Sequence, residues 1–281
     1  MTDKDLRNFI NNSLKEDVGE GDHTSLSTIP LNSESKAQLL IKDNGIIAGI
    51  DLAKKIFNVV DPDIRISKTI KDGDTVKKND IAFQVEGNSI SILKAERLVL
   101  NCMQRMSGIA TKTNYINSLL TNKKIKLLDT RKTTPLNRTI EKWAVRIGGG
   151  KNHRFGLDDM ILIKDNHIDF AGGITHAIQK SKVYLKDKKL KLDIIVEARN
   201  LNEVKEILNE GGIRRILLDN FSISETKDAI KTINNVCEIE SSGNINEDNI
   251  IEYGKCKIDF ISIGALTHSV DNFDLSLKAI E

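Results

Sequence analysis

The sequence has few cysteines and no long apolar run, and each of these absences excludes a class of protein. Three cysteines occur in 281 residues, far apart and without a C-x-x-C pair, so a disulfide framework or a cysteine metal or redox centre is not expected. We predict inert thiols in a cytoplasmic protein. No run approaches the roughly eighteen apolar residues of a membrane span, and the polar N-terminus lacks the apolar stretch of a signal peptide.

The net charge is also small. Lys and Arg number 42 and Asp and Glu 40, leaving +2, so nothing in the overall charge favours nucleic acid or a membrane surface as a partner. With 39% hydrophobic and 29% charged residues, the composition is that of a globular protein long enough for one large or two modest domains. Any anion site must therefore be local.

The first part of the chain is predicted to form a small α+β domain. A helix pattern near the N-terminus repeats apolar residues at Leu6, Phe9, Ile10 and Leu14. Short alternating strands follow, with a turn at 71–74. Their cores are expected at 37–41, 45–49, 64–66 and 81–85. A helix is expected from about Leu93 to Leu120, bent or interrupted near Gly108.

The second part alternates strands and helices. Its apolar strand cores are expected at 125–128, 160–163, 194–196, 216–218, 236–239 and 260–263. One intervening helix places Ile140, Trp143, Ala144 and Ile147 on one face, and Gly148 is placed to end it. Near-continuous apolar strands that alternate with helices predict a parallel sheet covered on its outer side, as in a β/α barrel.

Polar residues follow these strands where each apolar run ends. In a β/α barrel those ends meet on one face, where active sites are built. The cations there are Arg131, Lys132, Arg154 and Lys164, with His153 beside them. Charges at strand ends are often only solvated, but a cluster of cations repels itself unless an anion binds. Guanidinium forks suit carboxylates and lysine suits carboxylate or phosphate, so a small polyanion is predicted.

Two acidic residues and a glycine turn complete the set. Glu197 and Asp219 offer the hard oxygen ligands that hold magnesium beside substrate phosphates, although they could instead pair with the same lysines. The turn Ser241-Ser242-Gly243-Asn244 precedes a helix expected to begin near Asn246, which suggests an anion cradle, although small residues also form simple turns. Gly264 closes the next strand and would let backbone approach a phosphate.

Seven blocks of the sequence, spread in order over nearly the whole chain, resemble quinolinate phosphoribosyltransferase. They are Gly21-Asp22-His23-Thr24-Ser25, Glu96-Arg97 through Asn101, Ser107-Gly108-Ile109-Ala110-Thr111, Asp129-Thr130-Arg131-Lys132-Thr133-Thr134-Pro135, Gly148-Gly149-Gly150 with Asn152-His153-Arg154, Ile163-Lys164-Asp165-Asn166-His167 and Leu218-Asp219-Asn220. The resemblance implies an N-terminal α/β sandwich domain over 1–120 and an open, incomplete β/α barrel over 121–269. A tail of about 270–281 would return to the first domain.

The resemblance also implies roles. Quinolinate would be bound by Arg131, His153, Arg154 and Lys164, and by Arg97 of the partner subunit in a homodimer with shared active sites. Lys132 would act on the pyrophosphate side as a catalytic residue. Glu197 and Asp219 would be catalytic residues around the ribose and would also bind Mg²⁺, which enters with phosphoribosyl pyrophosphate. No organic cofactor would be needed.

The 5′-phosphate would be bound by Ser242, Gly243, Asn244 and Gly264. Asn244 departs from the second glycine of many relatives, which puts its phosphate contact in doubt. The implied reaction converts quinolinate and phosphoribosyl pyrophosphate to nicotinate mononucleotide, pyrophosphate and CO₂, with ribosylation preceding decarboxylation.

Two other functions stay open at this point. A relative of the same fold could use nicotinate or another nitrogen base, or serve molybdenum-related metabolism, but the clustered cations favour a dicarboxylate. The stretch 73–80 resembles hairpins of biotinyl and lipoyl carrier domains. A carrier would need a lysine at an exposed hairpin tip, and none stands in a suitable context.

Overall fold

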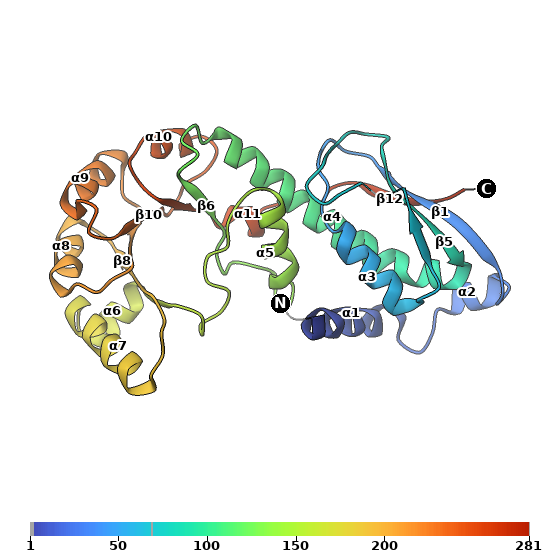
Figure 1. Ribbon diagram of the computed structural model, residues 1–281, viewed down its shortest axis with the longest axis horizontal. Coiled ribbons are helices and arrows are strands. Elements are labelled where there is room, and N and C mark those ends of the chain that lie inside the picture. Colours follow the sequence, from blue (N-terminus) through green and yellow to red (C-terminus); the bar gives the residue numbers. More distant parts are fainter. Residues whose placement is uncertain (1–2, 69, 281) are drawn as a thin grey trace. The chain divides into compact units, whose positions relative to one another are not determined.

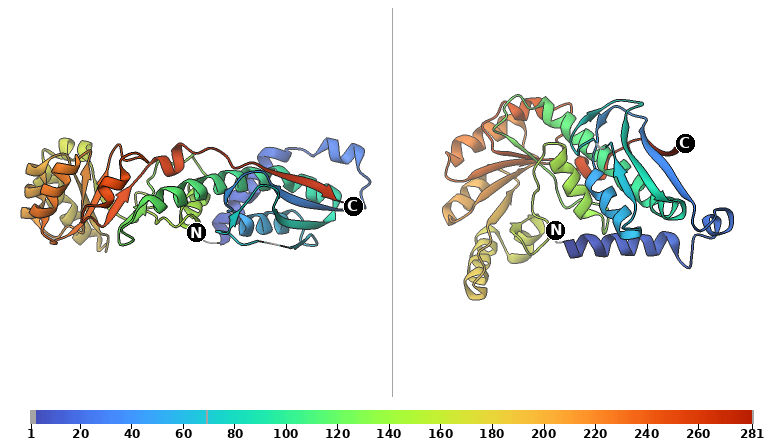
Figure 2. Two further views of the ribbon diagram at one scale, coloured as in Figure 1. Left: turned by 90° about the horizontal axis from the view of Figure 1, so that it is seen from above. Right: turned by 45° about the vertical axis from the view of Figure 1, so that its right-hand side comes forward.

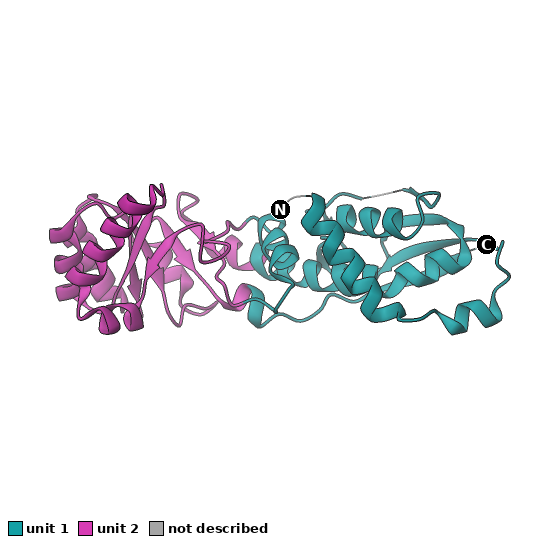
Figure 3. Ribbon diagram, turned by 90° about the horizontal axis from the view of Figure 1, so that it is seen from below, with its two compact units in different colours: residues 1–114, 133–149, 267–281 teal, residues 115–132, 150–266 magenta. Residues whose placement is uncertain are grey.

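The computed structural model describes residues 3–68 and 70–280. Residue 1, where the N-terminal domain is expected to begin, and residue 281, where the C-terminal tail is expected to end, lie outside the described residues. The chain forms two compact units (Figure 3). Unit 1 comprises residues 1–114, 133–149 and 267–281, and unit 2 comprises residues 115–132 and 150–266.

Unit 1 is built on an antiparallel sheet. Its strand order is β12-β1-β5-β3, so the last strand of the chain pairs directly with the first (Figure 1). The strands are β1 (Glu34–Ile41), β3 (Arg65–Ser67), β5 (Ile81–Asn88) and β12 (Leu275–Ile280), with a small pair formed by β2 (Gly45–Ile46) and β4 (Thr75–Val76). The helices are α1 (Asp3–Val18), α2 (His23–Thr28), α3 (Ile50–Val60), most of α4 (Ser89–Leu119) and α5 (Arg138–Ile147). Helix α11 (Ala265–His268) spans the boundary between the two units.

Helix α3 shows how the core of unit 1 is assembled. Its buried face includes Ile56 and Phe57, and the Phe57 ring meets Phe83 of β5 edge to face, with centroids 6.1 Å apart. The helix begins where the Asp72 carboxylate accepts the backbone N–H of Ile50 at 2.8 Å. This bond satisfies one of the otherwise unpaired donors at the helix start.

Helix α4 corrects the sequence prediction. The expected interruption near Gly108 is wrong, because the helix runs without a break from Ser89 to Leu119. A Cβ at Gly108 would collide with the backbone carbonyl of Asp271, so this glycine lets the C-terminal segment approach the helix. The helix predicted over 140–147 is present as α5, and Gly148 is its C-cap.

Unit 2 contains six parallel strands in the order β6-β11-β10-β9-β8-β7. They are β6 (Lys126–Leu128), β7 (Ile161–Ile163), β8 (Ile194–Ala198), β9 (Arg215–Asp219), β10 (Glu238–Ser242) and β11 (Phe260–Ser262). The connecting helices are α6 (Asp165–Ala171), α7 (Ile174–Lys188), α8 (Leu201–Glu210), α9 (Ile223–Ile233) and α10 (Ile250–Gly254). Figures 1 and 2 show these helices on the outer side of the sheet. The architecture is that of an open β/α barrel, as the sequence predicted.

The apolar strands of unit 2 are buried on both faces, which explains their sequence pattern. Every residue of β8 is buried. One strand is shifted from its expected position, because β10 begins at Glu238 and extends to Ser242. Val236 is 71% exposed and lies just after two asparagines with positive φ, Asn234 and Asn235, that follow α9. The strand therefore contains Glu240, which has no exposed surface.

Within the described ranges, no helix is long and apolar enough to cross a membrane. All three cysteines are free, and burial raises the pKa of the Cys102 thiol to about 12. A thiol with so high a pKa is unreactive at neutral pH.

Candidate active site

The predicted site residues of unit 2 gather at the carboxyl ends of its parallel strands. Each strand of the sheet is followed by at least one of them or contains one near its end. The set is Arg131 and Lys132 after β6, Lys164 after β7, Glu197 within β8, Asp219 ending β9, Ser242, Gly243 and Asn244 at the end of β10, and Gly264 after β11. This is the face on which β/α barrels place their active sites.

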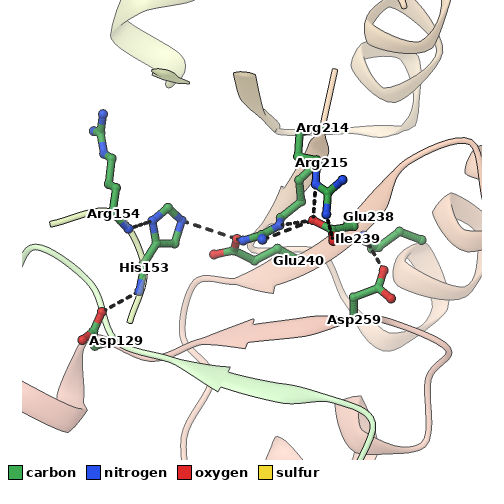
Figure 4. Close-up of polar contacts among 9 residues, drawn as sticks. All are labelled: Asp129, His153, Arg154, Arg214, Arg215, Glu238, Ile239, Glu240 and Asp259. Carbon is green, nitrogen blue, oxygen red and sulfur yellow. Dashed lines mark hydrogen bonds and ion pairs between the residues drawn. The ribbon is translucent and has the colours of Figure 1, made fainter. Parts of the chain in front are cut away.

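The segment that carries His153 and Arg154 continues the sheet beside β6. Lys151 forms a parallel bridge with Leu128, and the backbone N–H of His153 then donates to Oδ1 of Asp129 at 2.8 Å. Asn152 donates to the other carboxylate oxygen of Asp129. Asp129 is fully buried, so the carboxylate that directly follows β6 fixes this segment from inside the protein (Figure 4).

Arg154 is a buried cation close to a second one. It is 7% exposed, and its Nη1 donates to the backbone carbonyl of Met160 at 3.2 Å. Burial lowers the pKa of Arg154 below its ordinary value, and the charge of Arg131 lowers it further. Two neighbouring guanidinium groups form a site suited to carboxylates.

The His153 ring contacts the backbone of Arg154 and the side chain of Glu240. Its Nδ1 accepts the backbone N–H of Arg154 at 2.7 Å, and its Nε2 lies 3.4 Å from Oε2 of Glu240. Only 6% of the side chain is exposed. Both ring nitrogens thus contact the protein (Figure 4).

Lys164 lies beside the two carboxylates of the set. Lys164 Nζ lies 3.5 Å from Oε2 of Glu197, so one of the two acidic residues does pair with a lysine of the set. Burial raises the pKa of Glu197 above its usual value, Lys164 opposes this, and the charge of Asp219 adds to it. Asp219 is therefore close enough to act on Glu197 electrostatically, and together they offer two hard oxygen donors.

The turn after β10 is tied to the end of β9. Asn244 donates to Oδ1 of Asn220 at 2.9 Å, and Asn220 donates to Oδ2 of Asp219 at 2.7 Å. Gly243 has φ +85°, and a Cβ there would collide with the Asn220 side chain and lie 2.7 Å from its backbone nitrogen. Glycine is therefore required at this position.

The helix expected near Asn246 begins later. Helix α10 starts at Ile250 and has five residues, because Asn246 and Asn249 form side-chain turns instead. The prediction that a helix N-terminus directly reinforces the 242–244 turn is wrong. Any anion bound there must rely on the turn and its neighbours.

Arg97 belongs to the other unit. It is exposed on α4 and lines a hollow of about 550 Å³ together with residues of α1 and the segment 135–140. Leu136, which also lines this hollow, is 93% exposed. Unit 1 therefore presents Arg97 on its surface.

Sequence reasoning missed four residues that organise the site. They are Asp129, Asn220, Arg215 and Glu240. Asp129 and Asn220 were visible as polar residues at strand ends. The sequence indicates Arg215 and Glu240 more weakly. Each is a charged residue within a strand, and the two strands, β9 and β10, are neighbours.

Comparison with known proteins agrees with this geometry. The family domain described as "Quinolinate phosphoribosyl transferase, C-terminal domain" matches residues 109–278, and the corresponding N-terminal domain matches residues 22–107. A chloroplastic nicotinate-nucleotide pyrophosphorylase (carboxylating) of Arabidopsis thaliana is 46% identical over 98% of this chain and 82% of its own length. A probable nicotinate-nucleotide pyrophosphorylase (carboxylating) of Methanocaldococcus jannaschii is 41% identical over 97% of this chain and 96% of its own length.

Solved structures show the same likeness. NadC of Streptococcus pyogenes superposes with a TM-score of 0.93 at 34% identity, covering 100% of this chain and 99% of that chain. The nicotinate-nucleotide pyrophosphorylase of Francisella tularensis gives 0.91 at 37% identity, covering 100% and 98%. The two family-domain matches, the similar sequences and the similar solved structures all indicate the same family. The chain belongs to the quinolinate phosphoribosyltransferase family.

Proposed function

We propose that the strand-end site of unit 2 carries out the reaction of this family with the residue roles set out below. The reaction transfers phosphoribose from phosphoribosyl pyrophosphate to the nitrogen of quinolinate and releases pyrophosphate and CO₂, giving nicotinate mononucleotide for NAD biosynthesis. The observation that carries the assignment is the placing of Arg131 and Arg154 together, on the same strand-end face as the Glu197 and Asp219 carboxylates.

The quinolinate carboxylates bind the cations Arg131, Arg154 and Lys164. Two guanidinium forks can each take a carboxylate in a bidentate manner, which orients the planar ring as well as binding it. Lys164 adds a third positive charge and is drawn there by Glu197 at 3.5 Å. His153, which the sequence analysis placed in the same group, accepts the backbone N–H of Arg154.

The ribose and pyrophosphate bind on the acidic side. Loss of pyrophosphate leaves positive charge on the ribose C1, and the carboxylates of Glu197 and Asp219 stabilise that charge. Lys132, which is exposed after β6, attracts the departing pyrophosphate.

The donor set on this side fits Mg²⁺. Two carboxylates with room for substrate oxygens are typical of a magnesium site completed by phosphates and water, and no larger cluster of His, Cys, Asp and Glu exists in the described part of the chain. When bound, Mg²⁺ would neutralise pyrophosphate charge. No organic cofactor is needed.

The 5′-phosphate binds the turn Ser242–Asn244 and the backbone near Gly264. Gly243 and Asn244 both have positive φ within this turn, and the backbone N–H groups of a turn can form an anion cradle. Asn244 donates its side-chain amide to Asn220, so the backbone of this turn is the part left for the phosphate.

Decarboxylation follows ribosylation. Once the ring nitrogen is bonded to ribose it is positively charged, so it stabilises the electron pair that is left on C2 when the C2–carboxylate bond breaks and CO₂ leaves. The pair then takes up a proton at C2, and the product keeps one carboxylate. The guanidinium groups hold the ring in place during both steps.

The proposal is tested with quinolinate, phosphoribosyl pyrophosphate and Mg²⁺. Anion-exchange analysis should show nicotinate mononucleotide, and CO₂ should appear in equal amount. Replacing quinolinate by nicotinate should give no product at comparable concentrations. Efficient use of nicotinate without CO₂ release would overturn the assignment in favour of a relative with another base.

We also propose a homodimer in which Arg97 completes the pocket of the partner subunit. Its exposure on unit 1, beside the exposed Leu136, suits a surface that meets another chain. A two-fold dimer would then place Arg97 of one chain and Lys164 of the other in each pocket.

Mixing two inactive variants tests the shared pocket. If Arg97→Ala and Lys164→Ala chains are unfolded together and reassembled, half the dimers are mixed, and each mixed dimer has one intact pocket. Activity should recover to about a quarter of the wild-type value for independent isologous sites. Tagged chains must confirm exchange, and unmixed variants are the control. No recovery despite exchange would place Arg97 in its own subunit's pocket.

A cytoplasmic location is the last part of the proposal. Three free cysteines suit a reducing compartment. Fractionation of the source cells, followed by immunodetection, tests it.

A further inference from the structure

Glu240 is a buried acid in the middle of β10. It has no exposed surface, and its Oε2 accepts Nη1 of Arg215 from β9 at 2.8 Å and lies 3.4 Å from Nε2 of His153. Its Oε1 has no hydrogen-bond partner in the described part of the chain. Burial by itself would raise the pKa of Glu240, but His153 and Arg215 outweigh it and the pKa is lowered, so the group is a carboxylate.

A carboxylate at this position is costly, and Arg215 does not account for it. Removing a charge from water is unfavourable even when the charge is paired. Arg215 already has a second carboxylate, Glu238, at 3.2 Å, and its guanidinium lies over the Phe260 ring at 3.6 Å. The contact that Glu240 alone supplies is the one with His153.

His153 transmits that contact to Arg154. Nδ1 accepts the backbone N–H of Arg154, and Nε2 is the nitrogen that faces Glu240, at a distance of 3.4 Å from its Oε2. The backbone N–H of His153 is bonded to Asp129 at 2.8 Å. The peptide that leads into Arg154 is therefore held from β6 through Asp129 and from β10 through the imidazole (Figure 4).

We propose that Glu240 is a positioning residue for quinolinate, which fixes the His153 ring and thereby aims the Arg154 guanidinium at a substrate carboxylate. This inference rests on the proposed function. It means that Glu240, a residue in a strand interior, determines the direction in which the Arg154 guanidinium meets quinolinate. Shifts of about 1 Å in such groups reduce activity by about a hundredfold.

Two matched variants separate positioning from charge balance. Glu240→Gln and Glu238→Gln each remove one carboxylate from Arg215 on the same strand, but only Glu240 contacts His153. We expect Glu240→Gln to raise KM for quinolinate by about tenfold or more. KM for phosphoribosyl pyrophosphate should stay within about twofold, and Glu238→Gln should leave both constants near the wild-type values.

A third variant tests the link itself. In His153→Asn the side-chain oxygen takes the place of Nδ1 and can still accept the Arg154 N–H, but nothing reaches Glu240. This variant should raise KM for quinolinate as Glu240→Gln does. The double variant should be no worse than either single one, because both cut the same connection. If Glu240→Gln does not fold, His153→Asn alone must show the selective effect.

The outcomes are distinct. Equal effects of Glu240→Gln and Glu238→Gln on quinolinate, equal effects on both substrates, or additive effects of Glu240→Gln and His153→Asn would each overturn the inference. Thermal melting of every variant identifies loss of stability, which would lower kcat without a selective change in either KM. Failure of the wild-type chain to release CO₂ from quinolinate would instead refute the proposed function.

Discussion

The two sides of the candidate site differ in how their binding groups are held. On the quinolinate side Arg154 is 7% exposed, and its segment is fixed by buried side chains of β6 and β10. On the phosphate side Asn220 and Asn244 are exposed, and a glycine with positive φ shapes the backbone. A planar dicarboxylate needs guanidinium groups aimed in fixed directions, whereas a phosphate accepts backbone N–H groups from several directions.

This difference predicts opposite sensitivities. Changes beneath the quinolinate side should act at a distance through packed contacts. Changes on the phosphate side should act only where they alter the backbone. The predictions below are arranged from the largest expected effect to the smallest.

Chelation should have the largest effect and should separate the two sides. Excess EDTA should reduce turnover by at least about a hundredfold, because Lys132 alone neutralises pyrophosphate poorly. Quinolinate affinity, measured by calorimetry, should change by less than about twofold, because the guanidinium groups need no metal. Undiminished CO₂ release in excess chelator would contradict the magnesium proposal.

Arg154→Lys should be the most damaging conservative substitution. The charge is kept, but the bidentate fork and the bond to the Met160 carbonyl are lost. KM for quinolinate should rise by about a hundredfold while KM for phosphoribosyl pyrophosphate changes by less than about threefold. Arg214→Lys is the control and should change either KM very little. Arg214 precedes β9, at the end away from Asp219, and its side chain is 56% exposed. Equal weakening of both substrates would place Arg154 on the wrong side of the site.

Gly243→Ala should affect the phosphate side alone. Its φ of +85° disfavours a side chain and the Cβ would press on Asn220, so the turn must move. KM for phosphoribosyl pyrophosphate should rise by about tenfold, corresponding to the 1–2 kcal/mol typical of left-handed strain. Gly172→Ala is the matched control, because φ there is +86° and nothing lies within 4 Å. If Gly172→Ala raises KM as much, the effect is general strain and not phosphate binding.

Asn244→Gly should have the smallest effect. Its φ of 51° suits glycine, and the loss is one exposed hydrogen bond to Asn220. Steady-state kinetics should show a change of less than about threefold in KM for phosphoribosyl pyrophosphate. A larger increase would mean that the Asn244 side chain, rather than the backbone of the turn, serves the phosphate.

The sequence predicted what hydrophobic periodicity and long motifs encode. The strands of the barrel follow from runs such as Ile194–Val196, because burial on both faces demands apolar residues. The cations appear as residues at strand ends. The positioning of Arg154 could not be predicted, because Glu240 and Arg215 are charged residues in strand interiors, and only tertiary pairing makes such positions favourable.

Three local errors have a common physical origin. The break expected at Gly108, the strand expected from Val236 and the helix expected near Asn246 were all inferred from local propensity. The Gly108 break is removed by close approach of a distant segment, at Asp271. The other two are set by asparagines, which adopt positive φ before β10 and form side-chain turns before α10. Helix and strand propensity is a weak guide where a distant segment or an asparagine turn decides the conformation.

The pairing of β12 with β1 has a consequence for how the protein is made. Every strand of unit 2 precedes residue 267, so its sheet can form while the chain is still attached to the ribosome. The sheet of unit 1 lacks its final strand until Leu275–Ile280 have been synthesised and have left the exit tunnel. Until that point β1 has an open edge, and open edges recruit other chains. Until β12 has been synthesised and has paired, β1 is therefore a site at which the nascent chain can aggregate.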